Sequence, residues 1–120
     1  MLNLDTHILV SMLSGDLSPR EYGLVVANEL AISDVVLWEL AKLVQLGRLD
    51  MDLDSREFGQ GLRRFSILPI TLEIARTSTQ LDFSSDPADE IIAATSIVEN
   101  VPLMTRDRRI LKSRMVPFAK

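Results

Sequence analysis

Cysteine is absent from the chain, and histidine occurs once, as His7. The lack of thiols excludes disulfide bonds, thiolate nucleophiles and thiolate zinc sites, and one imidazole cannot build a site of several histidines. A glycine-rich phosphate loop and a Gly-x-Ser-x-Gly nucleophile elbow are also missing. Any metal site must therefore use oxygen ligands, which suit Mg²⁺ or Mn²⁺.

Long apolar runs are missing too, since nothing approaches the roughly 18 consecutive apolar residues of a membrane span. The first ten residues, MLNLDTHILV, lack the basic start and the small-residue cleavage site of a signal peptide. We therefore expect a cytoplasmic protein. Its 120 residues fit a single domain, residues 1–120, with one hydrophobic core.

The charges are unevenly distributed along the chain. A net charge of −4 argues against a polyanionic partner. Residues 106–120, however, contain six basic residues and one acidic residue, a net +5, which leaves −9 for residues 1–105. The basic segment is either a solvated helix face or an anion contact, and cations bound to some of the acids would remove much of the repulsion.

Short apolar segments alternate with helical stretches along the whole chain. We expect strands at 1–4, 29–32, 65–68 and 101–105, and a short edge strand at 116–119. We expect helices at 6–13, 19–28, 34–46, 55–64, 71–81 and 87–100, and a short one from 108. Strands of this kind separated by helices predict an α/β fold with a short-stranded, mainly parallel sheet covered on both faces.

Four acidic residues stand beside expected strand ends or inside an apolar helix: Asp5, Glu39, Asp89 and Asp107. Ligands bind beyond the carboxyl ends of the strands in open α/β sheets, and Asp5 and Asp107 both follow a strand. Several carboxylates close together raise one another's pKa values unless cations lie between them. If the four converge, the sequence predicts a metal-dependent nuclease.

Each acid also has a simpler structural explanation. Asp5 and Asp107 can cap the helices that follow them, and the dipole of a helix favours Asp89 in its first turn. Glu39 lies in the otherwise apolar run VVLWELA, where it must find a cation, a proton or the surface, for instance an ion pair with Lys42. We expect His7 to be structural or peripheral.

In this order and spacing, the segments LDTHILV, ISDVVLWELAKLVQLGRL and LDFSSDPADEIIAATSIVENVPLMTRD resemble a PIN domain, specifically a VapC-type toxin ribonuclease. The resemblance implies a PIN-like three-layer α/β/α sandwich and an endoribonuclease that uses Mg²⁺ or Mn²⁺. It also implies a homodimer and a cognate antitoxin protein. The residues it assigns to the metal site and catalysis are Asp5, Glu39, Asp89 and Asp107, with Thr105 as a supporting hydroxyl.

In such a nuclease, guanidinium groups of the basic segment would hold the RNA backbone, because they pair with phosphate through two hydrogen bonds. The candidates are Arg106, Arg108 and Arg109. The chain departs from many relatives at Ala88, where they carry an aromatic residue, and at Glu90, where they carry arginine. These departures affect substrate contacts and leave the four acids intact. We expect Trp38 to lie in the core.

Three other functions fit parts of the pattern. A phosphotransfer receiver domain needs adjacent acids after its first strand, whereas Thr6 follows Asp5. A haloacid-dehalogenase-like phosphatase needs a second aspartate two residues later, where His7 stands. A PIN-like fold kept as a non-catalytic RNA-binding or protein-interaction module remains the main alternative.

Overall fold

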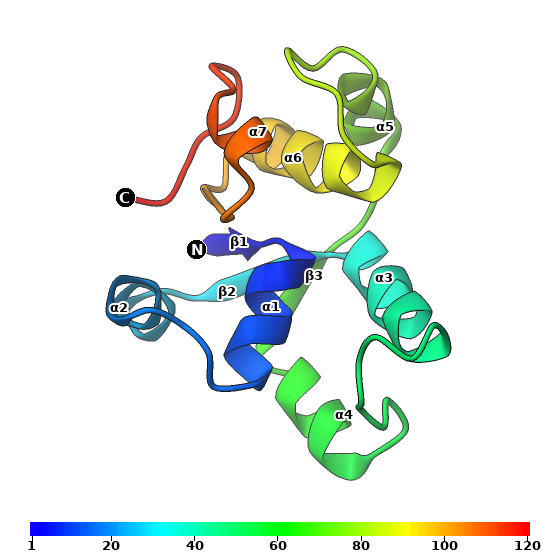
Figure 1. Ribbon diagram of the computed structural model, residues 1–120. Helices are drawn as coiled ribbons and strands as arrows, with labels where there is room; N and C mark the ends of the chain where they lie inside the picture. The colour runs from blue at the N-terminus through cyan, green and yellow to red at the C-terminus, as the bar shows by residue number, and fades with distance from the viewer.

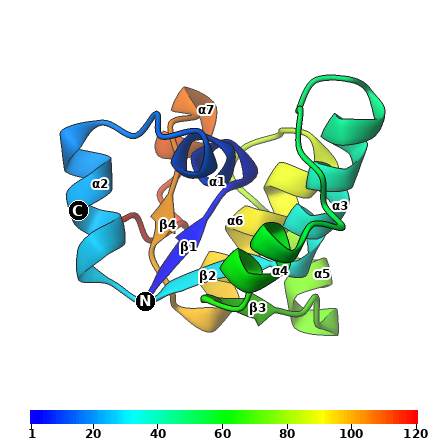
Figure 2. The same cartoon turned by 90° about the horizontal axis from the view of Figure 1, so that it is seen from below.

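Four short strands form one sheet in the order β3-β2-β1-β4, and every neighbouring pair is parallel. The computed structural model describes all residues 1–120. Seen from below, β1 and β4 run side by side (Figure 2). The strands are β1 (Leu2–Leu4), β2 (Leu30–Ser33), β3 (Phe65–Leu68) and β4 (Leu103–Met104).

Seven helices surround the sheet, so that the fold has three layers. Figure 1 shows α5, α6 and α7 above the sheet and α1 and α4 below it, with α2 and α3 at opposite ends of the strands. The helices are α1 (Thr6–Leu13), α2 (Pro19–Ala27), α3 (Asp34–Gln45), α4 (Arg56–Leu62), α5 (Leu72–Ser78), α6 (Pro87–Glu99) and α7 (Arg108–Leu111). The predicted three-layer α/β/α sandwich is confirmed.

Polar side chains fix where most helices begin. At six of the seven helix starts, the side chain of the preceding residue accepts a hydrogen bond from a main-chain N–H of the first turn. Ser18 and Glu21 form a complete capping box at α2. Beyond α3, Gly47 adopts a positive φ of 71°, which only glycine tolerates without strain.

The core lies between the sheet and the helices on its two faces. Its largest fully buried side chains come from strands, from α1 and α3 below and beside the sheet, and from α6 above it, and they include Leu4, Ile8, Ile32, Leu40 and Ile92. Because β1, β2 and β4 are covered on both faces, their residues are mostly apolar, whereas Ser66 and Ile67 of the edge strand β3 are exposed. The structure contains no helix that is long and apolar enough to span a membrane.

Some sequence-based predictions were wrong in detail. The expected edge strand at 116–119 is reduced to a single bridge between Leu103 and Phe118. Trp38, predicted to be in the core, is 57% exposed, because it lies about half a turn around α3 from the buried Val36 and Leu40. Asp86 precedes α6 as expected, but its side chain makes no capping hydrogen bond.

Candidate active site

Asp5 occupies the end of β1, at the first turn of α1. Its Oδ1 accepts the Ile8 main-chain N–H at 2.8 Å, so it caps α1, and it is only 5% exposed. Burial raises the pKa of this carboxyl, and the charge of Asp89 raises it further, while hydrogen bonds from Thr105 and Ile8 act in the opposite direction. Capping is thus confirmed, and it coexists with a buried carboxylate that faces other acids.

Glu39 reaches toward the start of α1 from the second turn of α3. The hydroxyl of Thr6 donates a short hydrogen bond to its carboxylate. Lys42 bonds Gln45 instead, at 3.0 Å, so the alternative of an ion pair between Glu39 and Lys42 is not formed. Burial raises the pKa of Glu39, and the charges of Asp89 and Asp5 add to this effect.

Asp89 lies in the first turn of α6, on the opposite face of the sheet from α1. Its Oδ2 accepts the Ser85 hydroxyl at 2.9 Å. Burial raises the pKa of Asp89, and the charges of Asp86 and Asp107 raise it further. Figure 1 shows why these acids approach one another: the first turns of α1, α3 and α6 all lie at the carboxyl end of the strands.

Asp107 caps the short helix α7 just beyond β4. Its Oδ1 accepts the main-chain N–H groups of Arg109, at 2.8 Å, and Ile110, at 3.4 Å. It is near enough to Asp89 for its charge to raise the pKa of that residue. The Thr105 hydroxyl accepts the Asp107 N–H at 3.1 Å and bonds Asp5, so Thr105 connects the two acids.

His7 is exposed on α1 at the edge of these acids. It lies close enough to Asp5, Glu39 and Asp89 for its charge to lower the pKa of each. The prediction of a peripheral histidine is consistent with this position.

The four acids lie close enough for their charges to interact, but their side chains are not arranged as a metal site. As the side chains are arranged, no three acidic or histidine residues lie close enough to hold one metal ion. The chemistry of the donors still fits a hard divalent cation, because the acids are accompanied by the hydroxyls of Thr6, Ser85 and Thr105 and form no ion pair with a basic residue. Metal binding would remove the unfavourable burial of uncompensated charge.

The three arginines expected to contact RNA differ in their surroundings. Arg106 binds Glu21 through two hydrogen bonds of 2.7 and 2.8 Å and is the only residue to form an ion pair with an acid. Its guanidinium is therefore engaged. Arg108 is exposed and makes no side-chain hydrogen bond, and Arg109 donates to the Ser84 carbonyl at 3.2 Å.

An apolar groove of about 390 Å³ borders Glu39. Its walls come from α3 and the start of α6, and Asp86 and Lys42 lie at its margin. The apolar lining residues are Trp38, Leu43, Leu46, Pro87 and Ala88. Exposed apolar surface next to a polar cluster is typical of an interaction site.

Sequence reasoning missed two residues of the cluster, Thr6 and Ser85. Both are hydroxyl residues near a site acid in the sequence: Thr6 directly follows Asp5, and Ser85 precedes Asp89 by four residues. A hydroxyl residue within four positions of a candidate acid was therefore the available signal for a residue of the cluster. It did not indicate that Thr6 would pair with Glu39, 33 residues away, rather than with its neighbour.

Comparison with known proteins agrees with the fold. Residues 3–114 match the family model described as PIN domain. Ribonuclease VapC22 from Mycobacterium tuberculosis is 34% identical over 91 residues, which cover 73% of this chain and 70% of that protein.

Two solved structures share the fold at lower identity. The toxin-antitoxin complex from Klebsiella pneumoniae matches with a TM-score of 0.72 and 22% identity over 93% of this chain and 91% of that one. VapBC2 from Rickettsia felis, bound to a DNA fragment from its promoter, matches with a TM-score of 0.70 and 21% identity over 99% and 98% of the two chains.

Proposed function

Since the chain belongs to the PIN-domain family and to its VapC-type toxin ribonucleases, we propose that it cleaves RNA as a metal-dependent endoribonuclease. The products of its metal-assisted hydrolysis would be shorter RNA chains. The proposed metal ligands are Asp5, Glu39, Asp89 and Asp107.

One observation carries this proposal: the buried Asp5 and the half-buried Glu39 and Asp89 come from three separate segments, lie close enough for their charges to interact, and form no ion pair with a lysine or an arginine. Asp5, Glu39 and Asp89 each have a raised pKa because of burial, and each is affected by the charge of at least one other acid. A fold that keeps such carboxylates together at a cost in stability does so for function more often than for structure. A divalent cation is the partner that their oxygen chemistry favours.

When bound, Mg²⁺ or Mn²⁺ would polarise a phosphate oxygen and activate a water molecule for attack on phosphorus. The protein supplies the rest. The Ile8 N–H and the Thr105 hydroxyl orient Asp5, and the Thr6 hydroxyl orients Glu39. A carboxylate of the cluster would accept the proton of the attacking water while the P–O bond to the 3′ oxygen breaks, which leaves a 5′-phosphate and a 3′-hydroxyl.

RNA would lie along the basic C-terminal segment. Arg108 is exposed and free to pair with phosphate, and Arg109 lies one residue further along α7. Arg106 was a third candidate, but its guanidinium is held by Glu21, so we assign it to the stability of the fold.

Two protein partners belong to the same proposal. The related Klebsiella pneumoniae structure is described as a toxin-antitoxin complex, and we infer that a cognate antitoxin binds this chain and blocks its site in the cytoplasm. A homodimer is supported by the large apolar side chains that remain exposed, Trp38 on α3 and Leu72 at the start of α5 among them.

The decisive experiment measures cleavage of single-stranded RNA by the purified protein with Mg²⁺, with Mn²⁺ and with EDTA. We expect cleavage that requires the metal and that is lost in Asp89→Asn. Asp50→Asn is the matched control, because Asp50 is exposed and far in sequence from the site acids.

The spacing of the carboxylates favours one second candidate, a non-catalytic RNA-binding module, because no three of them form a metal site as they stand. Binding of RNA without cleavage under any metal condition would establish that function and exclude the nuclease.

A further inference from the structure

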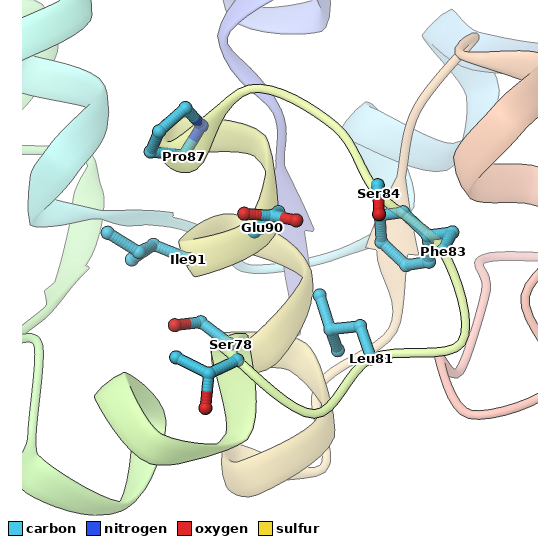
Figure 3. Close-up of a pocket in the computed structure, with 8 residues that line it drawn as sticks. Ser78, Leu81, Phe83, Ser84, Pro87, Glu90 and Ile91 are labelled. Carbon is cyan, nitrogen blue, oxygen red and sulfur yellow. The ribbon is translucent and has the colours of Figure 1, made fainter.

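The loop between α5 and α6 stands over a cavity of about 440 Å³. The end of α5, the loop and the first turns of α6 line this cavity (Figure 3). Leu81 and Phe83 pack against the core and hold the first part of the loop, whereas beyond Phe83 the position of the loop depends on the polar contacts that it makes. These contacts matter because the loop carries Ser85, whose hydroxyl bonds Asp89.

Two contacts hold the end of the loop where Ser85 lies. Glu90, on α6, accepts the Ser85 main-chain N–H at 3.3 Å, and Figure 3 shows its side chain extending beside the cavity toward the loop. Arg109, on α7, donates to the Ser84 carbonyl at 3.2 Å. The single peptide group between Ser84 and Ser85 is thus held from both sides, its carbonyl by α7 and its N–H by α6.

The Ser85 hydroxyl is the one hydrogen-bond donor that the structure gives to the Asp89 carboxylate. It fixes one carboxylate oxygen, Oδ2, and leaves Oδ1 without a hydrogen bond. Donors of this kind orient metal ligands, and losing one typically costs 10-fold to 100-fold in metal affinity or activity.

We propose that Ser85 is a positioning residue for Asp89 and that Glu90 sets the place of Ser85 by binding its main-chain N–H. This inference rests on the proposed function, because it takes Asp89 to be a metal ligand. It gives Glu90, which binds the Ser85 main chain, a role in building the site.

The test measures the affinity of the metal-free protein for Mn²⁺ by calorimetry, together with the kcat and KM for RNA cleavage. We expect Ser85→Ala to weaken Mn²⁺ binding by about 10-fold and to lower kcat, with KM for RNA unchanged. Ser85→Thr keeps the hydroxyl and should restore both values. Glu90→Ala should weaken Mn²⁺ binding by a smaller factor, about 3-fold, and Glu90→Gln, which keeps an acceptor, should lie near the parent.

Ser84→Ala is the matched control, since only the main-chain carbonyl of Ser84 is bonded and the substitution leaves it in place. The thermal unfolding temperature of each variant in EDTA checks that the fold is kept. If Ser85→Ala is folded and binds Mn²⁺ as the parent does, the positioning role is wrong while the nuclease proposal stands. If the parent itself neither binds Mn²⁺ nor cleaves RNA, the proposed function fails first.

Discussion

Arg106 binds Glu21 across 85 residues of sequence, with its Nε and Nη2 atoms 2.8 and 2.7 Å from the two carboxylate oxygens of Glu21. The pair ties the turn between Thr105 and Asp107 to the start of α2. Glu21 is 8% exposed, whereas the Arg106 side chain is 43% exposed. Arg106, which the sequence suggested as an RNA contact, thus connects two parts of the fold that are distant in the sequence.

The ion pair between Arg106 and Glu21 should make the free energy of unfolding depend on pH in the acid range. Hydrogen bonds from Arg106 lower the pKa of Glu21 to about 2, well below its value in an unfolded chain. The stabilisation is therefore complete above about pH 4.5 and is lost as the pH falls toward 2. Glu21→Gln should lower the free energy of unfolding at pH 7 by about 1 to 2 kcal/mol. This value is smaller than the pKa shift alone would give, because solvent screens the exposed guanidinium of Arg106.

Urea unfolding between pH 2 and pH 7 measures this effect, and the slope of stability against pH should flatten in Glu21→Gln. Glu99→Gln is the control, because Glu99 is exposed at the end of α6 and forms no ion pair. An equal loss of stability at pH 2 and pH 7 would show that the carboxylate charge of Glu21 contributes nothing.

Asp5→Asn should stabilise the metal-free protein at neutral pH. The folded-state pKa of Asp5 is raised by burial, so its contribution to stability falls as the pH rises through that pKa, and the charged form is unfavourable at pH 7. Asparagine removes the charge and still caps α1 through Oδ1. We expect a gain of about 1 kcal/mol, seen as a rise of a few degrees in unfolding temperature in EDTA.

Asp5→Ala separates the two roles, since it removes both the charge and the cap. Loss of the cap costs about 1 kcal/mol, so Asp5→Ala should unfold at a lower temperature than Asp5→Asn. A lower unfolding temperature for Asp5→Asn than for the parent at pH 7 in EDTA would contradict the prediction.

Mn²⁺ should stabilise the parent and not the site variants. Binding at 100 times Kd adds about 2.7 kcal/mol to the free energy of unfolding. Thermal unfolding with and without Mn²⁺ measures it, and Asp89→Asn should lose most of the shift while Asp50→Asn keeps it. An equal shift in all three proteins would place the metal elsewhere.

Arg108 and Arg109 should contribute to the salt dependence of RNA binding. Each phosphate contact to single-stranded RNA adds about 0.7 to the slope of log K against log salt concentration. We expect Arg108→Gln to reduce the slope by that amount in a binding assay with Asp89→Asn protein, which prevents cleavage. Arg76→Gln, on α5, is the control. If the slope falls equally in Arg108→Gln and Arg76→Gln, α7 is not a specific contact for RNA.

Trp38→Ser should weaken the proposed homodimer. Trp38 is 57% exposed in the single chain, and buried aromatic residues often dominate the energy of an interface. Analytical ultracentrifugation should show dissociation at a protein concentration at least 10-fold higher than for the parent. Tyr22→Ser, on α2, is the matched control, and dissociation caused by that variant instead would move the interface to α2.

The fold was predictable because its signals are local. Caps such as Ser18, the glycine after α3 and the apolar strands each act over a few residues, and together they specify the order of strands and helices. The edge strand was wrong because its single bridge depends on where residue 118 meets β4, which is a contact between distant segments.

The candidate site was predictable in part. The acids could be selected because carboxylates at strand ends and in an apolar helix need an explanation, and parallel strands bring their carboxyl ends to one edge. Of their hydroxyl partners, the family resemblance indicated Thr105, whereas Thr6 and Ser85 were not selected. Which hydroxyl meets which acid depends on how α1, α3 and α6 pack, and the sequence carries no local signal for that.

By itself, the sequence determined most of the secondary structure, the parallel sheet and the choice of candidate acids, since periodicity, capping and chemistry operate over short stretches of chain. Only the tertiary structure decided that Thr6 pairs with Glu39, that Arg106 pairs with Glu21 and that Trp38 faces solvent. Those outcomes depend on the packing of elements far apart in the sequence, where side-chain direction and distance, rather than residue type, decide which groups meet.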